Sequence, residues 1–217
     1  MAKLIWDKVG ERFYETGVSN CALYVYDDGA QGFGAGVAWN GITNITETPS
    51  GAEANPIYAD NIKYLSLLSA EEFGASIEAY TYPEEFEECD GSAAIAPGVM
   101  VGQQARKKFC IAYKTIKGND IQNDAYGYKL HLIYNCNAAP SERAYSTIND
   151  SPEAIAFSWE ISTTPVAVTG HKPTSILTID SAKVDAVKLA SVEEALFGGD
   201  STEAKILMPD EVLALLA

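Results

Sequence analysis

Apolar and polar residues alternate through residues 73–82, a period of two that fits an extended strand with one buried face. Every second residue from Phe73 onward is small or apolar, and Glu78 lies in the opposite set. The expected inner face comprises Phe73, Ala75, Ile77, Ala79 and Thr81, and the outer face Gly74, Ser76, Glu78, Tyr80 and Tyr82. Residues 153–163 repeat the pattern, with Ile155, Phe157, Trp159 and Ile161 on one face. Such segments must pair into sheets.

More strands are expected along the chain. They fall at residues 21–26, 39–48, 57–58, 62–65, 108–116, 126–136 and 174–180. Clusters rich in Gly, Pro and Asp separate them, among them Asp27-Asp28-Gly29 and Thr48-Pro49-Ser50-Gly51. Ala59-Asp60-Asn61 is either a turn or an irregularity within a strand. Residues 118–127 and 138–151 are expected to be loops or hairpin tips.

Two helices complete the predicted fold. Pro83, acidic residues in the first turn and Gly91 beyond the end predict a short helix at 84–89, with Phe86 facing the domain. Leu189, Val192 and Leu196 recur at helical spacing, and Ser191 with Glu194 matches a capping box.

The fold class that follows is mainly β, an antiparallel β-sandwich or barrel with a flanking short helix and a C-terminal helix. Residues 1–185 are expected to form the β-sandwich domain with an N-terminal arm. Residues 186–217 are expected to form a C-terminal helix and an extended tail.

Charge excludes several classes of function. The 217 residues contain 30 acids and 15 bases, giving a net charge of −15. This balance argues against tight binding to nucleic-acid phosphates or to an anionic membrane. No stretch approaches the roughly 18 apolar residues of a membrane span. Residues 1–17 lack the apolar core of a signal peptide, so we expect synthesis in a cytoplasm.

Catalytic and metal-binding patterns are missing from the sequence. His131 and His171 stand 40 residues apart, and no zinc-protease, nucleophile-elbow or phosphate-loop motif occurs. The Asp/Asn clusters do not fit calcium-loop spacing. Four cysteines without C-x-x-C spacing are expected to be buried apolar side chains. We therefore expect no enzyme activity, no metal and no cofactor.

Opposite charges are segregated along the chain. Residues 71–90 contain eight acids and no base, whereas residues 106–117 contain five bases and no acid. The two blocks could meet between identical subunits, which makes Arg106, Lys107 and Lys108 candidates for stacking contacts. Two alternatives fit the pattern equally well: the blocks form two separate solvated faces, or they contact each other within one chain.

Several segments, taken in order, resemble the major tail proteins of long-tailed, non-contractile bacteriophages. They are Trp6-Asp7-Lys8-Val9-Gly10-Glu11-Arg12-Phe13-Tyr14-Glu15-Thr16-Gly17, Val37-Ala38-Trp39-Asn40-Gly41, Glu47-Thr48-Pro49-Ser50-Gly51-Ala52-Glu53, Tyr58-Ala59-Asp60-Asn61-Ile62-Lys63-Tyr64, residues 72–83, 127–132 and 157–165. The resemblance runs through most of residues 6–185 and has no catalytic signature.

The resemblance implies a tail tube protein, a structural component of the virion. Such proteins form six-fold rings that stack into a hollow tube through which the genome passes. The implied partners are other copies of the chain and the tape-measure, tail-tip and tail-terminator proteins. DNA would be a transient, non-specific passenger, with no membrane involved.

Residues 39–82 are the expected channel-lining sheet and inter-subunit loop. Candidate residues for the lumen or the subunit interface are Glu47, Glu53, Asp60, Glu71, Glu72 and Glu78. An exterior or seam position for Glu78 is nearly as well supported. The alternative function is a monomeric or small-oligomer β-sandwich that binds carbohydrate or a receptor, using Tyr80, Tyr82, Tyr126 and Tyr134. An enzyme with a carboxylate pair is a third reading.

Overall fold

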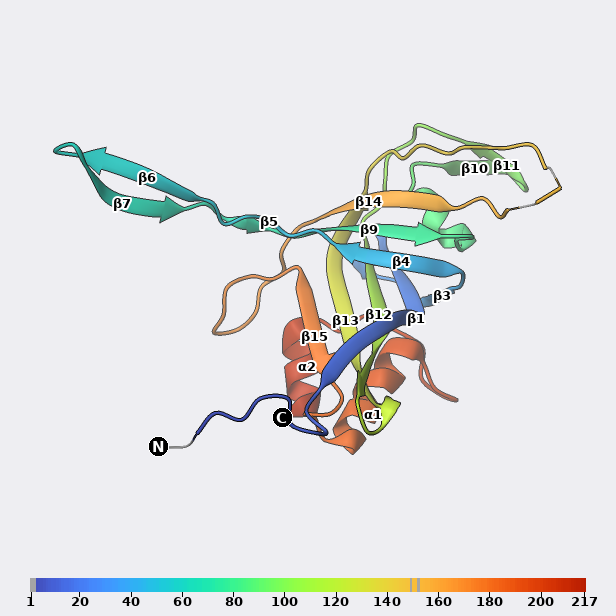
Figure 1. The fold of residues 1–217 in the computed structure, drawn as a ribbon. Helices are drawn as coiled ribbons and strands as arrows, with labels where there is room; N and C mark the ends of the chain where they lie inside the picture. The colour runs from blue at the N-terminus through green and yellow to red at the C-terminus, as the bar shows by residue number, and fades with distance from the viewer. Residues whose placement is uncertain (1–2, 149, 152) are drawn as a thin grey trace.

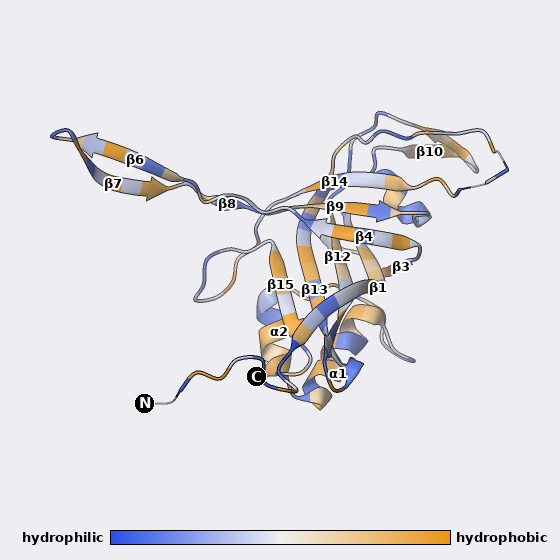
Figure 2. Ribbon diagram, viewed as in Figure 1, coloured by the Kyte–Doolittle hydropathy of each residue, from blue (hydrophilic) through white to orange (hydrophobic). Residues whose placement is uncertain are grey.

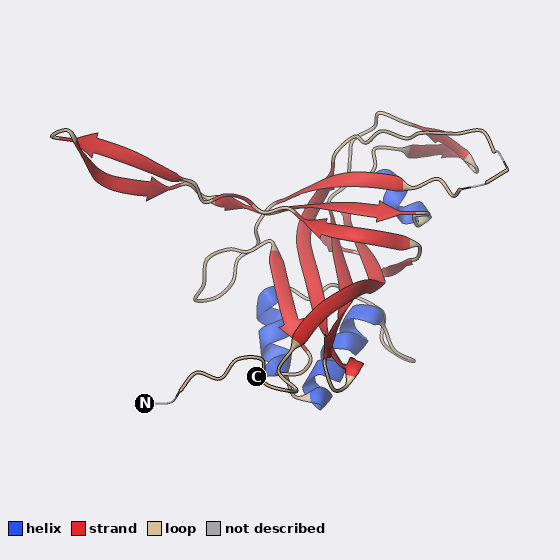
Figure 3. Ribbon diagram, in the orientation of Figure 1, coloured by secondary structure: helices blue, strands red, loops and turns tan. Residues whose placement is uncertain are grey.

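The computed structural model describes residues 3–148, 150–151 and 153–217. It is mainly β, with antiparallel sheets and two α-helices, as Figure 3 shows, and this confirms the predicted fold class. The strands are β1 (Phe13–Asp27), β2 (Gly32–Phe33), β3 (Val37–Trp39), β4 (Ile42–Glu47), β5 (Ser50–Gly51), β6 (Ala54–Ala59), β7 (Ile62–Leu68), β8 (Glu71–Glu72), β9 (Gly74–Ala79), β10 (Ala93–Ala96), β11 (Val99–Val101), β12 (Phe109–Asn119), β13 (Asn123–Ala138), β14 (Phe157–Thr163) and β15 (Ile176–Asp180). The helices are the 3-10 helix η1 (Glu84–Glu88), α1 (Ala186–Phe197) and α2 (Pro209–Leu216).

One nine-stranded sheet folds over on itself to make two layers (Figure 1). Its order is β2-β1-β12-β13-β14-β9-β4, with β15 paired to β13 and β3 to β1. Strand β13 makes the corner: residues 129–133 pair with β15, and residues 136–138 pair with β14. The chain of pairings therefore passes from the β1-β12-β13 layer into the β14-β9-β4 layer without a break.

The space between the two layers is filled by an aromatic core. Phe86 of η1 is fully buried, with ring centroids 4.4 Å from Trp39 and 5.1 Å from Trp159. Ala75, Ile77 and Ala79 of β9 are also fully buried, which confirms the predicted inner face at these three positions. Phe73 is half-buried and Thr81 is exposed, and both lie outside the strand. The short helix predicted at 84–89 is present as one 3-10 segment, and Phe86 docks it against the sheets.

A second core lies on the opposite face of β1, β12 and β13, under the two α-helices. Leu189, Val192 and Leu196 of α1 are buried there, as their spacing predicts. The Tyr24 hydroxyl donates to the Leu196 carbonyl at 2.6 Å, and the Tyr134 hydroxyl donates to the Leu207 carbonyl at 3.0 Å. Both tyrosines are fully buried, so α1 and the segment before α2 are fixed to the sheet by hydrogen bonds as well as apolar contact.

The C-terminal region differs from its prediction in two details. Asp185, rather than Ser191, caps α1, because its carboxylate accepts from the backbone N–H groups of Val187 and Lys188. Ser191 lies inside the helix and donates to the Val187 carbonyl. The segment expected as an extended tail contains α2, which begins at Pro209, a favoured first helical residue.

We expect Phe86→Ala to lower the free energy of unfolding by about 3–5 kcal/mol, since it removes a fully buried ring and leaves a cavity. Urea denaturation followed by far-UV circular dichroism measures this change. The matched control is Ile95→Ala, whose side chain is 66% exposed and should shift the midpoint little. An unchanged midpoint for Phe86→Ala would show that η1 is not docked.

Candidate functional site

A long β-hairpin leaves the domain between β4 and β9, and we call residues 50–72 the hairpin arm (Figure 1). Strands β5 and β8 pair at its base, and β6 and β7 pair along its length. Asp60 and Asn61 form the two-residue tip with φ values of 52° and 62°, as a type I′ hairpin turn requires. The Ala59-Asp60-Asn61 segment is therefore a turn and not a strand irregularity.

Every residue of β6 and β7 is exposed, including the apolar ones. Ile57 pairs with Leu65 on one side of the ribbon, and Leu67 lies on that side too because side chains alternate. Tyr64 and Leu68 lie on the opposite side, with exposed fractions of 68% and 72%. Figure 2 shows hydrophobic residues spread along both strands of the arm.

An arm of this kind needs a partner. A two-stranded hairpin is marginally stable by itself in water, and contiguous exposed apolar surface marks an interaction site. The free edges of β6 and β7 also present unpaired backbone groups that can template pairing with another chain. The hairpin arm is therefore the strongest candidate interface in the described part of the molecule.

The solvent side of β4, β9 and β14 is a second candidate surface, which we call the outer sheet face. Glu78 pairs with Asn44 of β4 and Ser158 of β14, and Ser76 pairs with Thr46 and Glu160. Paired residues of antiparallel strands point to the same side, so these six side chains share one face. The face combines amide and hydroxyl groups with the two carboxylates of Glu78 and Glu160.

The structure separates the six acidic candidates into three groups. Glu78 lies exposed on the outer sheet face, whereas Glu53, Asp60, Glu71 and Glu72 are exposed on the hairpin arm. Glu47 belongs to neither surface, because its carboxylate lies within hydrogen-bonding distance of Tyr113 and His131 of the other layer. A lumenal position for these acids in an assembly stays a prediction.

The basic block is paired mostly within the chain. Arg106 lies 3.3 Å from the Asp90 carboxylate, and Lys107 lies 2.6 Å from Glu88. Asp90 also accepts a hydrogen bond from Arg143, a partner that the charge pattern does not reveal. The contact within the chain that the sequence left open is thus present. A stacking contact through Arg106, Lys107 and Lys108 between subunits stays a prediction.

The tyrosines expected to form a ligand pocket do not form one. Tyr134 is fully buried in the second core, so its assignment to a binding surface is wrong. Tyr82 is half-buried against Trp159, with ring centroids 5.5 Å apart, and Tyr126 packs on Phe13 at 5.1 Å. Tyr80 alone of the four is mostly solvent-exposed. These positions remove the aromatic platform that the carbohydrate or receptor reading requires.

Among the described residues, no group of three or more His, Cys, Asp or Glu side chains is arranged to hold a metal ion. All four cysteines are buried and free. Burial raises the thiol pKa of Cys21 and Cys110 to about 12. The described helices include none that is long and apolar enough to span a membrane.

Replacing residues 54–68 with a short turn should leave the domain folded, with a change in unfolding free energy below about 1 kcal/mol, because this part of the arm has no buried side chain. Thermal melting of the monomeric variant tests this expectation. A large drop in melting temperature would mean that the arm belongs to the folding core.

No family model matches the chain, and no curated protein matches it. Among solved structures, the chain is similar to one from the "Cryo-EM structure of the anti-feeding prophage (AFP) baseplate, 6-fold symmetrised", at 8% sequence identity and a TM-score of 0.38. The match covers 83% of this chain and 100% of that chain. A likeness this weak carries no argument about function.

Proposed function

We propose that this chain is the building block of a phage tail tube and assembles into six-fold rings stacked around a channel for DNA. The observation that carries this proposal is the hairpin arm, whose two sides expose apolar residues far from the domain core. The sequence resemblance to major tail proteins supports the same role. Tape-measure, tail-tip and tail-terminator proteins are the further partners of this proposal.

The arm explains why the chain assembles. It projects from one side of the domain (Figure 1), and in the proposed ring it contacts a surface of its neighbour other than that neighbour's own arm. Such heterologous contacts form closed rings or extended stacks, whereas a self-complementary patch forms only a dimer. Covering the apolar side chains of the arm supplies the driving force, because burial of apolar surface is favourable by about 25 cal/mol per Å².

The outer sheet face suits a channel wall. Its hydroxyl and amide groups hold water, and its carboxylates at Glu78 and Glu160 repel phosphate. A wall of this chemistry lets DNA pass without binding. The excess of acids over bases across the whole chain acts in the same direction.

We expect the purified protein to form rings or tubes visible by electron microscopy, alone or with tail initiator and tape-measure proteins. The double variant Tyr64→Lys and Leu68→Lys should abolish these assemblies, because it places two charges on one apolar side of the arm. Lys63→Ala is the control, since Lys63 is an exposed neighbour of Tyr64 and its replacement leaves the apolar side chains of the arm in place.

Two results would contradict this proposal. One is a wild-type chain that stays monomeric at high concentration even with its initiator proteins. The other is a double variant that forms normal tubes. Circular dichroism of each variant establishes that the domain itself is folded.

Glu78→Lys should permit tube assembly and slow DNA ejection, since it replaces a repulsive group on the outer sheet face with one that binds phosphate. The control is Glu203→Lys, which makes the same charge change at an exposed residue outside that face. Ejection rates of phage carrying each variant, measured over a range of salt concentrations, test this expectation. A normal rate for Glu78→Lys would remove the outer sheet face from the channel.

A further inference from the structure

Glu47 stands at the point where the chain leaves the domain to form the hairpin arm. It is the last residue of β4, and the arm begins three residues later. Its backbone pairs with Ala75, a fully buried residue of β9, so the Glu47 side chain points toward the space between the two layers. A carboxylate at the end of an apolar core is unusual and needs partners there.

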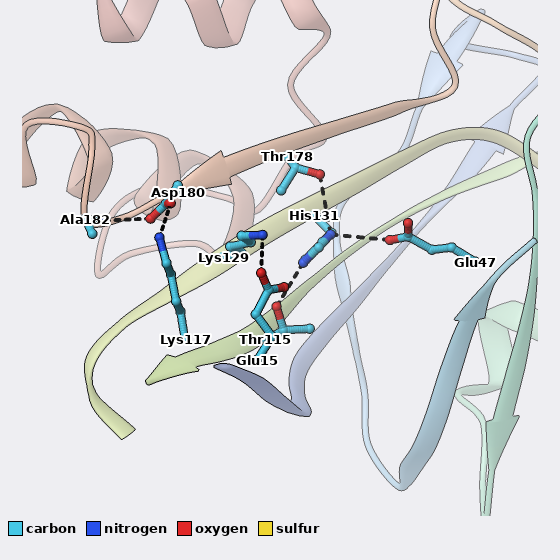
Figure 4. Close-up of polar contacts among 9 residues, drawn as sticks. All are labelled: Glu15, Glu47, Thr115, Lys117, Lys129, His131, Thr178, Asp180 and Ala182. Carbon is cyan, nitrogen blue, oxygen red and sulfur yellow. Dashed lines mark hydrogen bonds and ion pairs between the residues drawn. The ribbon is translucent and has the colours of Figure 1, made fainter. Parts of the chain in front are cut away.

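Two aromatic rings of the opposite layer, Tyr113 and His131, hold this carboxylate. Figure 4 shows the contact with His131. The Tyr113 hydroxyl donates to Glu47 Oε1 at 2.9 Å, and His131 Nδ1 lies 3.4 Å from the same oxygen. The two rings stack on each other with centroids 4.8 Å apart and an interplanar angle of 3°. Both rings are buried, so the site that receives the carboxylate is rigid.

Hydroxyl groups fix the orientation of the imidazole. Thr115 Oγ1 lies 2.9 Å from His131 Nε2, and Thr178 Oγ1 lies 3.5 Å from Nδ1. Thr115, His131 and Thr178 come from β12, β13 and β15, so three strands set the position of one ring. Figure 4 shows the ring lying between the two threonines and facing Glu47.

We propose that Glu47 is a positioning residue for the hairpin arm: its charged carboxylate, held by Tyr113 and His131, fixes the direction in which the arm leaves the domain, and neutralising it frees the arm. This inference rests on the proposed function only in giving the arm its role. Through its contacts with Tyr113 and His131, Glu47 links the root of the arm to the β12-β13 layer.

The charge of Glu47 matters because its surroundings favour the ionised form. The hydrogen bond from His131 lowers the pKa of Glu47 below its ordinary value of 4.5, with a further contribution from Tyr113 and from the positive charge of Lys129. Desolvation opposes this shift without reversing it. The ionisable groups that face the site are His131 and Lys129 of β13 and Tyr113 of β12, and Glu15 of β1 pairs with Lys129.

The sign of the pH effect follows from the lowered pKa. A carboxyl whose pKa is lower in the folded protein contributes stability above its ordinary pKa and loses it as pH falls through the folded value. The anchor is therefore complete at neutral pH, and it is lost as pH falls from the ordinary value of 4.5 through the lower pKa of the folded protein.

Distance measurements by double electron–electron resonance test the proposal directly. Spin labels are placed at Lys63→Cys on the arm and Ser158→Cys on β14, both exposed strand positions, while the four native cysteines are buried. Dilution with excess unlabelled protein confines the signal to pairs within one chain. The compared chains are the otherwise wild-type protein, Glu47→Ala, Glu47→Gln and the control Glu53→Ala, which removes an exposed acid from the arm itself.

We expect a narrow distance distribution for the wild type at neutral pH, and about twofold or greater widening for Glu47→Ala, because a released hinge samples more orientations. Glu53→Ala should keep the narrow distribution. Wild-type protein should widen on acidification, whereas Glu47→Gln should be wider at neutral pH and change little with acid. The Gln variant retains Glu53, Glu71 and Glu72, so it controls for their titration.

A Glu47→Ala distribution as narrow as that of the wild type would overturn the proposal. Should circular dichroism show that this variant is unfolded, Tyr113→Phe removes only the donating hydroxyl and must also widen the distribution. The arm's distance distribution could widen when Glu47 is neutralised in a protein that forms no tubes. That result would overturn the tube function and leave the anchor standing. Conversely, the protein could form tubes while Glu47→Ala keeps the narrow distance distribution. That result would overturn the anchor and leave the tube function standing.

Discussion

Burial of three strands on both faces is the constraint on which the structure depends. In β1, Cys21 and Leu23 face the aromatic core between the layers, while Ala22 and Tyr24 face the core under the helices. Strands β12 and β13 are shared between the two cores in the same way. Any shift of register by one residue would exchange the side chains of the two cores, so the pairing is strongly specified. Because these three doubly buried strands fix the fold, the residues of the outer sheet face and the hairpin arm are not needed to specify it.

Double burial also explains which parts of the fold were predictable from the sequence. Strands β9 and β14 bury one face each, so alternation revealed both the strands and the inward residues Ile77 and Trp159. In β13 both faces are covered, and a period of two no longer separates inside from outside. The sequence prediction accordingly places Tyr134 in a surface pocket, although the side chain is fully buried and its hydroxyl donates to the Leu207 carbonyl.

The candidate surfaces were predictable only in part, because exposure depends on what other segments cover. The sequence indicated two short strands on either side of Asp60, but their composition is that of buried strands. Nothing local shows that they leave the domain. Asp90 illustrates a second limit, since Arg106 and Arg143 lie 16 and 53 residues away and meet it only through the fold. The sequence prediction groups Glu47 with the acids of the arm, because sequence position does not show which way a side chain turns.

A charged anchor and an apolar arm have complementary physical roles. Apolar contact supplies affinity but little direction, since it is roughly proportional to the area removed from water. A carboxylate held by a hydroxyl and an imidazole requires particular distances and angles, so it defines one orientation. Glu47 keeps 38% of its side chain exposed, which limits the desolvation cost that burying a charge would otherwise impose. An arm that exposes apolar residues on both sides can bind in several ways. A root held at one angle restricts those ways to the one that an ordered assembly can repeat.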